Sequence, residues 1–512
     1  MRQQQQIFGR QLLLMGSALV SLGILASVPA RAADEHKTTA FQIIDRNAKQ
    51  IADIGDAVFF YAEPGMQEVQ STKLLKDTLE AAGFTVELGG AGMPTNLWAK
   101  WGSGKPTILI ASEIDALPEG SQTPGSIPRK PMVAGAPGHM EGHNTHAGIT
   151  AGAMFALKKV MEQYKLPGTI MLSLGPAEEQ LASRPFLVRA GYLKDVDAAL
   201  IVHIGDNFNT GWGLQNYAAI SATFTFHGKT AHGAVNPWDG KDAVDAVELM
   251  DIGLDKLREH LRPTARTHRT IVAGGIQPNI IPDLGKIWWF VRDATAATAK
   301  ENFDKLVKIG EGAALMTGTT MDPPDVIASA WPQLGNKTIS EGIRKNMETV
   351  GLPKWSDEEV AFAKEFQKAN GKKEVGLATA LPPPGSRPQS FSSNDIGDYT
   401  WNVPTGLMTF PGSVPGIGYH AWPAAVTPTS TMAHKGMVAA SKVMAASALD
   451  LLTSPELLQR AKAEFAEQTK DTKYFSLLPD TAKPQTDLNK EVMDRLRPEM
   501  AKFYMKVTPR FE

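Results

Sequence analysis

Thr107-Ile-Leu-Ile-Ala-Ser112 is a short, mostly apolar run that is followed at once by the acidic pair Glu113 and Asp115. Two similar runs, Thr169-Ile-Met-Leu-Ser-Leu174 and Ala198-Ala-Leu-Ile-Val202, are followed within four residues by an acidic residue or a histidine. Such runs are typical of central strands in parallel sheets, because both faces of those strands are buried. Helical patterns separate them, so the sequence predicts an α/β domain with a mostly parallel sheet.

The pattern changes near Tyr217. Residues 220–226 alternate between apolar and polar side chains, as a half-exposed strand does, and a long helical pattern follows over 242–261. Two strand patterns and another helical pattern come next, at 270–273, 286–292 and 299–315. This β-α-β-β-α order indicates an inserted α+β domain of the ferredoxin-like type.

Residues 1–32 have the pattern of a secretory signal. Arg2 and Arg10 give a basic start, Leu12 to Leu25 form an apolar stretch, and Pro29-Ala-Arg-Ala32 supplies small residues at positions −3 and −1 of a cleavage site. We predict cleavage after Ala32 and a periplasmic or secreted protein. An uncleaved anchor is the alternative, but the apolar stretch is shorter than the roughly 20 residues that a span needs. No later segment is expected to be long and apolar enough to cross a membrane, so we expect no stable membrane anchor.

Removal of the signal leaves 480 of the 512 residues, too many for one small core. We expect a catalytic domain in two parts, residues 33–216 and 331–512, with a helical tail, and the inserted domain at 217–330. The mature chain has 49 basic and 54 acidic side chains, a net charge of −5, and so gives no reason to expect nucleic acid as a partner. Because the chain has no cysteine, any metal must be held by His, Asp or Glu.

Four clusters of polar residues are candidates for chemistry, and three of them follow apolar runs, where ligands collect in parallel sheets. Glu113 and Asp115 share a face of an extended chain, so one could meet a metal while the other orients a ligand; solvated or helix-capping acids are the alternative. The stretch from His139 to His146 holds three histidines and a glutamate, of which Glu141 and His143 are the natural pair of ligands. We do not expect a core role here, because each buried polar group would need its own partner. An exposed His-rich loop is the alternative.

The remaining clusters complete a set of nitrogen and oxygen ligands. Glu178 and Glu179 repel each other, so they indicate either a cation or separate tasks; an acidic helix start is the alternative. A single histidine after a strand is more often structural than a ligand, so His203 is a candidate ligand only because the other clusters accompany it. His420 or His434 offers a last ligand. The set suits two divalent ions such as Zn²⁺ or Mn²⁺. Glu178 would then accept a proton from an activated water and pass it to the leaving amine of an amide.

Several stretches between residues 45 and 450 together carry a family resemblance: Glu113-Ile-Asp-Ala-Leu-Pro118, Gly138-His-Met-Glu-Gly-His-Asn144, Pro176-Ala-Glu-Glu179, Phe226-His-Gly-Lys-Thr-Ala-His232, Gly310-Glu-Gly-Ala-Ala-Leu-Met-Thr-Gly-Thr319, Ser393-Asn-Asp-Ile-Gly-Asp398 and Ala433-His-Lys-Gly-Met437. The chain resembles the metal-dependent aminoacylase/carboxypeptidase amidohydrolases, most closely the p-aminobenzoyl-glutamate hydrolase B-subunit group. The resemblance implies a zinc-peptidase-like catalytic domain and an inserted lid that commonly mediates dimerisation. We therefore expect a homodimer.

The resemblance also implies roles for single residues. His143, Glu179 and His203 would be metal ligands, Glu178 the base and His420 the last ligand, with His434 as the second choice for that place or a substrate contact.

In the lid, the resemblance implies that His232 stabilises the oxyanion, often across the dimer interface. Asn279 and Arg292 fall where the family contacts the substrate's carboxylate or carbonyl. The planar fork of an arginine can bond both oxygens of a carboxylate. A surface charge at a strand end is the alternative for Arg292.

Glu141 departs from the close relatives, which carry a bridging cysteine there, whereas more distant branches use aspartate. A carboxylate bridge favours harder ions and suits an oxidising compartment. The leading hypothesis is hydrolysis of a small N-acyl or N-aroyl amino acid, such as p-aminobenzoyl-glutamate, or of a dipeptide. The alternative is a degenerate member that binds metal or a small acid without turnover. A protease for folded proteins is disfavoured because a lid favours small substrates.

Overall fold

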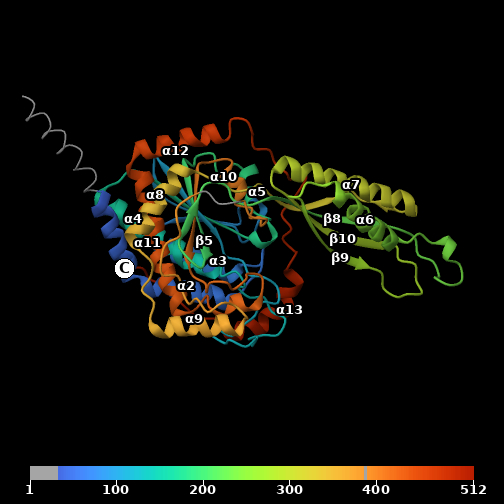
Figure 1. The fold of residues 1–512 in the computed structure, drawn as a ribbon, viewed down its shortest axis with the longest axis horizontal. Coiled ribbons are helices and arrows are strands. Elements are labelled where there is room, and N and C mark those ends of the chain that lie inside the picture. Colours follow the sequence, from blue (N-terminus) through green and yellow to red (C-terminus); the bar gives the residue numbers. More distant parts are fainter. Residues whose placement is uncertain (1–32, 386–388) are drawn as a thin grey trace, which may run out of the picture.

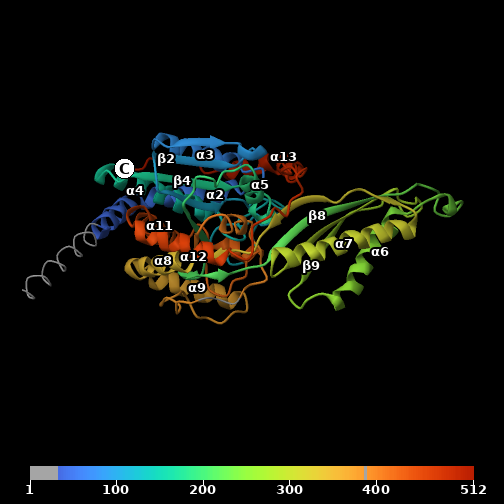
Figure 2. The same cartoon turned by 90° about the horizontal axis from the view of Figure 1, so that it is seen from above.

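The computed structural model describes residues 33–385 and 389–512, so the predicted signal segment lies outside the described residues. The chain forms a body, made by residues 33–217, 331–385 and 389–512, and an elongated arm, made by Ala218–Ala330 (Figures 1 and 2). The arm projects from one side of the body in both views.

The body is built around a seven-stranded sheet whose four central strands, β4, β3, β5 and β14, are parallel, while its edge strands pair antiparallel. The predicted central, mostly parallel sheet is confirmed. In spatial order the strands are β1 (Thr85–Leu88), β2 (Leu97–Ser103), β4 (Gly168–Gly175), β3 (Thr107–Glu113), β5 (Ala198–Gly205), β14 (Thr405–Pro411) and β6 (Asn209–Gly211).

Both faces of this sheet are covered. Along β3, Ile108 and Ile110 join one hydrophobic core, while Leu109 and Ala111 join the other. This double burial explains why the central strands are continuously apolar rather than alternating. On the first face, α4 (Asn144–Tyr164) packs against α2 (Ala48–Tyr61) and α11 (Thr431–Thr453), which in turn packs on α8 (Lys337–Val350).

The helix α11 is long and apolar enough by composition to cross a membrane, so our expectation that no later segment would have this character is wrong. The reason lies in its packing, because 78% of its most apolar window is buried inside the body. A helix that is apolar all round is also what a central core position requires.

The other elements of the body are shorter or peripheral. After α12 the C-terminal tail is largely irregular up to α13, and its end returns to α4, where Phe511 stacks on Phe155 with ring centres 4.9 Å apart. The shorter or peripheral elements of the body are a helix at 33–46, α3 (Val69–Ala81), α5 (Arg184–Arg189), α9 (Asp357–Ala369), α10 (Gly397–Thr400), α12 (Pro455–Gln468), α13 (Lys490–Met500) and the small pair β7 (Gly213–Leu214) and β13 (Leu334–Gly335).

The arm has a β-α-β-β-α-β order and an antiparallel sheet in which β8 and β10 are central, which is the ferredoxin-like arrangement. The pairing of β10 with β8 shows which end of the arm is near the body. Arg292 lies opposite Ala219 near the body, while Leu284 lies opposite His227 at the far end. Ten extended residues of β10 span about 30 Å. The elements are β8 (Ala218–His227), α6 (Ala243–Leu257), β9 (Arg266–Gly274), β10 (Leu284–Asp293), α7 (Ala296–Thr317), β11 (Thr320–Met321) and β12 (Asp325–Ala330).

Candidate metal centre

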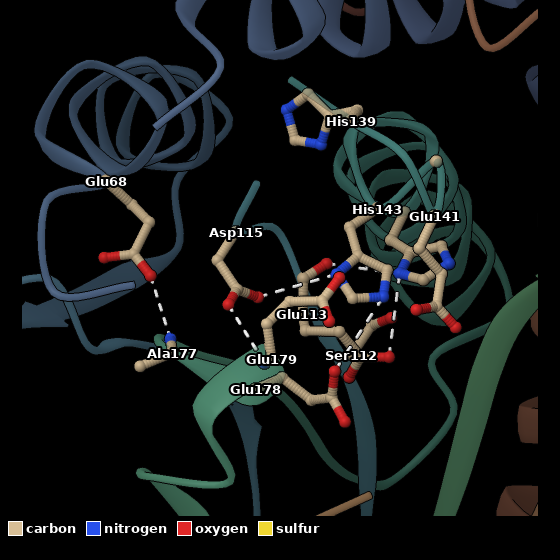
Figure 3. Close-up of polar contacts among 12 residues, drawn as sticks. Glu68, Ser112, Glu113, Asp115, His139, Glu141, His143, Ala177, Glu178 and Glu179 are labelled. Atoms are coloured by element: carbon tan, nitrogen blue, oxygen red, sulfur yellow. Dashed lines mark hydrogen bonds and ion pairs between the residues drawn. The ribbon is translucent and has the colours of Figure 1, made fainter. Parts of the chain in front are cut away.

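Three neighbouring strands bring polar residues to one edge of the sheet. Glu113 is the last residue of β3, Glu178 follows β4 by three residues, and His203 lies near the end of β5. Because β4, β3 and β5 are adjacent and parallel, their carboxyl ends meet. Figure 3 shows Glu113 and Glu178 beside the ring of His143, which lies at the N-terminus of α4.

Two loops complete the cluster from other parts of the chain. Gly142 has a φ of +75°, which lets the chain turn sharply between Glu141 and His143. The backbone N–H of His420 donates to the carbonyl of Met140 at 3.2 Å, and this contact holds the two loops together. The structure thus brings together all five predicted ligands: Glu141, His143, Glu179, His203 and His420.

The ligand atoms form two overlapping groups. Glu141, His143 and Glu179 offer one atom each within 4.8 Å of one another, and so do Glu113, His143 and His203. Between the groups, His203 Nε2 lies 3.4 Å from Glu141 Oε1 and 3.8 Å from Glu113 Oε1. His203 Nδ1 bonds the carbonyl of Ile204 at 3.0 Å, which leaves Nε2 facing the cluster as a candidate ligand atom.

The donor set fits divalent cations. Both ring nitrogens of His143, Oε1 of Glu113 and Oδ1 of Asp115 are buried and have no hydrogen-bond partner within the described part of the chain. Buried polar atoms without partners are costly, and several buried carboxylates in one place need positive charge. Cations held by the oxygen and nitrogen atoms of this cluster would satisfy both requirements.

Asp115 supports the cluster from behind. Its Oδ1 lies 3.5 Å from Nδ1 of His143, and its Oδ2 accepts a hydrogen bond of 3.1 Å from the backbone N–H of Glu179. These contacts fix the His143 ring and the backbone of Glu179 relative to each other. Asp115 therefore orients two candidate ligands.

The two adjacent glutamates have perturbed acidities. Burial, and then the charges of Glu113 and Glu179, raise the pKa of Glu178 well above its usual value. Burial and the charge of Glu141 raise the pKa of Glu179 to about 8. Burial alone would also raise the pKa of Glu141, but the hydrogen bond with His420 and nearby imidazoles lower it to about 2.

A strained turn aims Glu178 and Glu179 into the site. Ala177 and Leu181, on either side of this turn, have left-handed φ values of +54° and +57°, which are unfavourable for residues other than glycine. The fully buried carboxylate of Glu68 accepts a 2.9 Å hydrogen bond from the N–H of Ala177 (Figure 3). Thr95 donates to the other oxygen of Glu68 at 2.6 Å. Sequence reasoning missed Glu68, because nothing in its local pattern distinguishes it from a helix-start acid.

Two histidines of the central motif are core residues, contrary to our expectation. His139 Nε2 contacts the carbonyl of Val58 at 3.1 Å, and its ring lies apart from the carboxylates in Figure 3. His146 Nε2 accepts from the N–H of Ile204 at 3.0 Å, while its Nδ1 faces the carbonyl of Glu113 at 3.2 Å. Burial lowers the pKa of both rings, to about 3 for His139. The backbone partners that the sequence did not reveal make these buried rings tolerable.

A pocket of about 330 Å³ opens beside the cluster and is lined by Glu178 and Arg292, among others. The Nε of Arg292 is buried and has no partner among the described residues. Burial lowers the pKa of Arg292, and the charge of Glu178 opposes this shift. Amide and hydroxyl side chains form much of the remaining wall: Asn209, Gln215, Gln333, Ser392 and Asn394.

Three of the predicted residues lie away from this pocket. His232 and Asn279 are exposed in loops at the far end of the arm, where Gly233 N–H donates to the carbonyl of Asn279 at 2.9 Å. His434 bonds Asp56 at 2.8 Å and lines a different surface pocket. Within one chain, only Arg292 of the predicted arm residues reaches the cluster.

Comparison with known proteins gives a consistent result. Residues 109–455 match the model of the peptidase family M20/M25/M40. The chain is 33% identical over 469 residues to the p-aminobenzoyl-glutamate hydrolase B-subunit of Escherichia coli (strain K12), covering 86% of this chain and 97% of that protein. It is 26% identical over 442 residues to the Xaa-Arg dipeptidase of Mus musculus, covering 84% and 92%.

The fold also matches a solved structure. A dinuclear metal binding peptidase of the M20 family from Bacillus subtilis superposes with a TM-score of 0.53 at 19% identity. The match covers 80% of this chain and 99% of that one, so it includes both body and arm.

Proposed function

This chain belongs to peptidase family M20/M25/M40 and is a metal-dependent amidohydrolase, and we propose that it hydrolyses the amide bond of a small N-acyl or N-aroyl amino acid or a dipeptide, with Glu178 as the general base. One observation carries this proposal: Glu178 is buried beside both ligand groups and lines the same pocket as Arg292. An acid–base residue and a carboxylate-binding residue thus face one space of substrate size.

The ligands are proposed to be Glu141, His143, Glu179, His203 and His420. Two divalent cations held there, Zn²⁺ or Mn²⁺, would polarise the amide carbonyl and make a water acidic enough to give up its proton near neutral pH. The all-oxygen-and-nitrogen set, with Glu141 in place of a thiolate, favours the harder of these ions.

Glu178 would take the proton of the attacking water and deliver it to the leaving amine. Its raised pKa favours the protonated form that the second transfer requires, and the positive charge held by its neighbours would favour the carboxylate needed for the first. Arg292, across the pocket, would bind the substrate's carboxylate through its planar fork and so place the amide next to Glu178.

We further propose that two copies of the chain assemble through the arm, so that His232 and Asn279 of one copy reach the pocket of the other. Their positions at the far end of the arm, about 30 Å from Arg292 along β10, support this arrangement. The relative in Escherichia coli is named as one part of a larger enzyme, so assembly with a different chain is the other outcome of a mass measurement in solution.

Export is proposed from the pattern of residues 1–32. N-terminal sequencing of the protein recovered from a periplasmic or secreted fraction should start at Ala33. A start at Met1 in a cytoplasmic fraction would contradict export.

The test of the catalytic proposal is Glu178→Gln in the metal-loaded protein, assayed on p-aminobenzoyl-glutamate, N-acyl amino acids and dipeptides. The loss of a general base should lower kcat about 10²- to 10⁴-fold while the metal content is kept. Glu119→Gln removes an exposed acid nearby and serves as the control. Turnover at the wild-type rate in Glu178→Gln would disprove the base assignment, and its absence in the wild type on every substrate would favour a degenerate metal-binding member.

A further inference from the structure

We propose that Glu113 is a metal ligand of this centre, held in position by a fully buried ion pair between Arg184 and Asp395. The proposal rests on the metal-dependent function above but not on the identity of the substrate. The sequence left open whether Glu113 or Asp115 meets a metal; the proposal assigns that place to Glu113, beside the five other ligands, and gives a task to Arg184 and Asp395.

The two oxygens of Glu113 have different surroundings. Oε2 accepts a hydrogen bond of 2.8 Å from Nη2 of Arg184. Oε1 is buried, has no hydrogen-bond partner among the described residues, and lies 3.8 Å from Nε2 of His203. Oε2 is therefore anchored, while Oε1 faces Nε2 of His203 and Nδ1 of His146, each 3.8 Å away. Of these two rings, His203 groups with Glu113 and His143 as candidate metal ligands.

Arg184 is completely buried at the start of α5 and is held from several sides. Besides Glu113, it donates from Nη2 to the carbonyl of Ser112 at 2.6 Å and from Nη1 to Oδ1 of Asp395 at 3.0 Å. Nη1 also donates to the hydroxyl of Ser183 at 3.2 Å. With these contacts the guanidinium has a single orientation, which it transmits to the Glu113 carboxylate.

Asp395 fixes the other end of this network. Its Oδ2 accepts from the backbone N–H groups of Ser183 and Arg184 at 2.9 and 3.0 Å and from the Ser183 hydroxyl at 3.0 Å. All of these side-chain hydrogen bonds, with the one to Nη1 of Arg184, go to Ser183 or Arg184, and none goes to a candidate metal ligand. Asp395 therefore supports the Glu113 carboxylate through Arg184, as a positioning residue.

The net charge of Glu113, Arg184 and Asp395 also supports a cation at Oε1 of Glu113. One guanidinium is shared by the carboxylates of Glu113 and Asp395, so the three side chains together keep one negative charge in a fully buried place. An uncompensated buried charge is strongly unfavourable. The unpartnered Oε1 is where that excess charge meets His143 and His203, and a cation bound there removes it.

The experiment is a calorimetric titration of the metal-stripped full-length mature chain with Mn²⁺, without substrate. Glu113→Gln should weaken one class of Mn²⁺ site by at least about tenfold, since it removes a ligand charge but keeps the shape. Glu119→Gln, an exposed acid six residues away, should bind as the wild type does. Unchanged affinity for every Mn²⁺ in Glu113→Gln would overturn the ligand assignment.

The positioning role of Asp395 is tested by comparing two variants, Asp395→Asn and Asp398→Asn. Asp395→Asn should weaken Mn²⁺ binding about 10- to 100-fold, as expected when the support of a ligand is removed. Asp398→Asn removes another fully buried carboxylate of the same segment, which bonds Tyr474 and the backbone of Trp331 and not Arg184, and should leave the affinity unchanged. Equal affinities in Asp395→Asn and the wild type would overturn the positioning role.

A second variant keeps the ligand assignment testable, and one outcome separates it from the proposed function. If Glu113→Gln does not fold, Glu113→Asp keeps the charge and withdraws the oxygen by about 1.5 Å, and wild-type Mn²⁺ affinity in that variant overturns the assignment. If the wild type hydrolyses no amide but Glu113→Gln still loses Mn²⁺ affinity, the catalytic proposal fails and the ligand assignment stands.

Discussion

Nε2 of His420 lies 2.6 Å from Oε2 of Glu141, although 279 residues separate them in the chain. This contact joins, at the candidate metal centre, the part of the body that precedes the arm in sequence and the part that follows it. It also couples their acidities, because the hydrogen bond to Glu141 raises the pKa of His420 and is a main reason why the pKa of Glu141 is low. Without cations, the two side chains form an ion pair; the proposed cations would replace this contact, with both side chains as ligands.

The metal-free protein should lose stability as the pH rises from about 7 to about 8. In the folded chain, burial and Glu141 raise the pKa of Glu179 to about 8, and the hydrogen bond with Glu141 raises that of His420. A group whose pKa is raised by folding stabilises the fold below its ordinary pKa, and this stabilisation is lost as the pH rises through the folded value. His139 and His146, whose pKa values are lowered by burial, act in the opposite direction only below about 6.5.

Thermal melts of the metal-stripped and Mn²⁺-loaded protein at these two pH values measure the effect. Loading with Mn²⁺ should reduce the loss, since bound cations favour the deprotonated ligands. The part due to Asp398, whose pKa burial raises to about 8 and which is no candidate ligand, should remain. Glu179→Gln should show a smaller loss in the metal-free state. A metal-free protein that is more stable at the higher pH would contradict the arrangement.

Arg292 should control affinity for the substrate's carboxylate. Replacement by Lys keeps the charge but loses the planar fork, so KM for a carboxylate-bearing amide should rise about 10- to 100-fold with little change in kcat. The control is Arg266→Lys, because Arg266 lies opposite Arg292 on β9 but bonds the carbonyls of Pro263 and Ala265 outside the pocket. A substrate whose carboxylate is converted to an amide should no longer distinguish wild type from Arg292→Lys, and a persistent difference would argue against this contact.

If His232 acts in the partner's pocket, two inactive variants should rescue each other. Mixing Glu178→Gln with His232→Ala chains, after dissociation and reassembly, should restore about a quarter of the wild-type activity, because half of the dimers are mixed and each has one intact site. His227→Ala changes another exposed arm histidine, which pairs with Asp322, and is the control for the arm. No recovery in mixtures shown to contain mixed dimers would place His232 outside the partner's site.

Glu68 should affect kcat through the turn that carries Glu178. Glu68→Ala removes the acceptor for the N–H of Ala177 and should lower kcat more than it raises KM, since the left-handed turn would relax. Glu68→Gln keeps an acceptor oxygen for Ala177 and a group for Thr95, and should restore most of kcat. Equal kcat in the Ala variant and the wild type would show that the turn holds its shape without Glu68.

The sequence predicted the parts of the fold that local pattern controls. The apolar runs ending at Ser112, Leu174 and Val202 are central strands, because burial on both faces leaves a continuous apolar signal. The strand β14 was not distinguished, since Thr405–Pro411 lies in a region rich in Pro and Gly and is a strand only through pairing with β5 and β6.

Some residues of the candidate site could likewise be predicted from local sequence, and others could not. Glu141 and His143 stand in a dense motif and could be proposed as ligands from spacing, whereas the family resemblance assigned Glu179 as a ligand. Arg184 could not, because its partners Glu113 and Asp395 lie 71 and 211 residues away and its own neighbourhood is ordinary in composition. His139 and His146 were misjudged for the same physical reason: their backbone partners come from remote segments.

The number of cations bound per chain tests the account most directly. Metal-stripped wild-type protein should bind two Mn²⁺ ions in a titration followed by elemental analysis, and amide hydrolysis in the same samples should appear only as these sites fill. Full hydrolysis without bound metal, or a folded chain that binds no divalent ion, would contradict the convergence of these side chains on a metal centre.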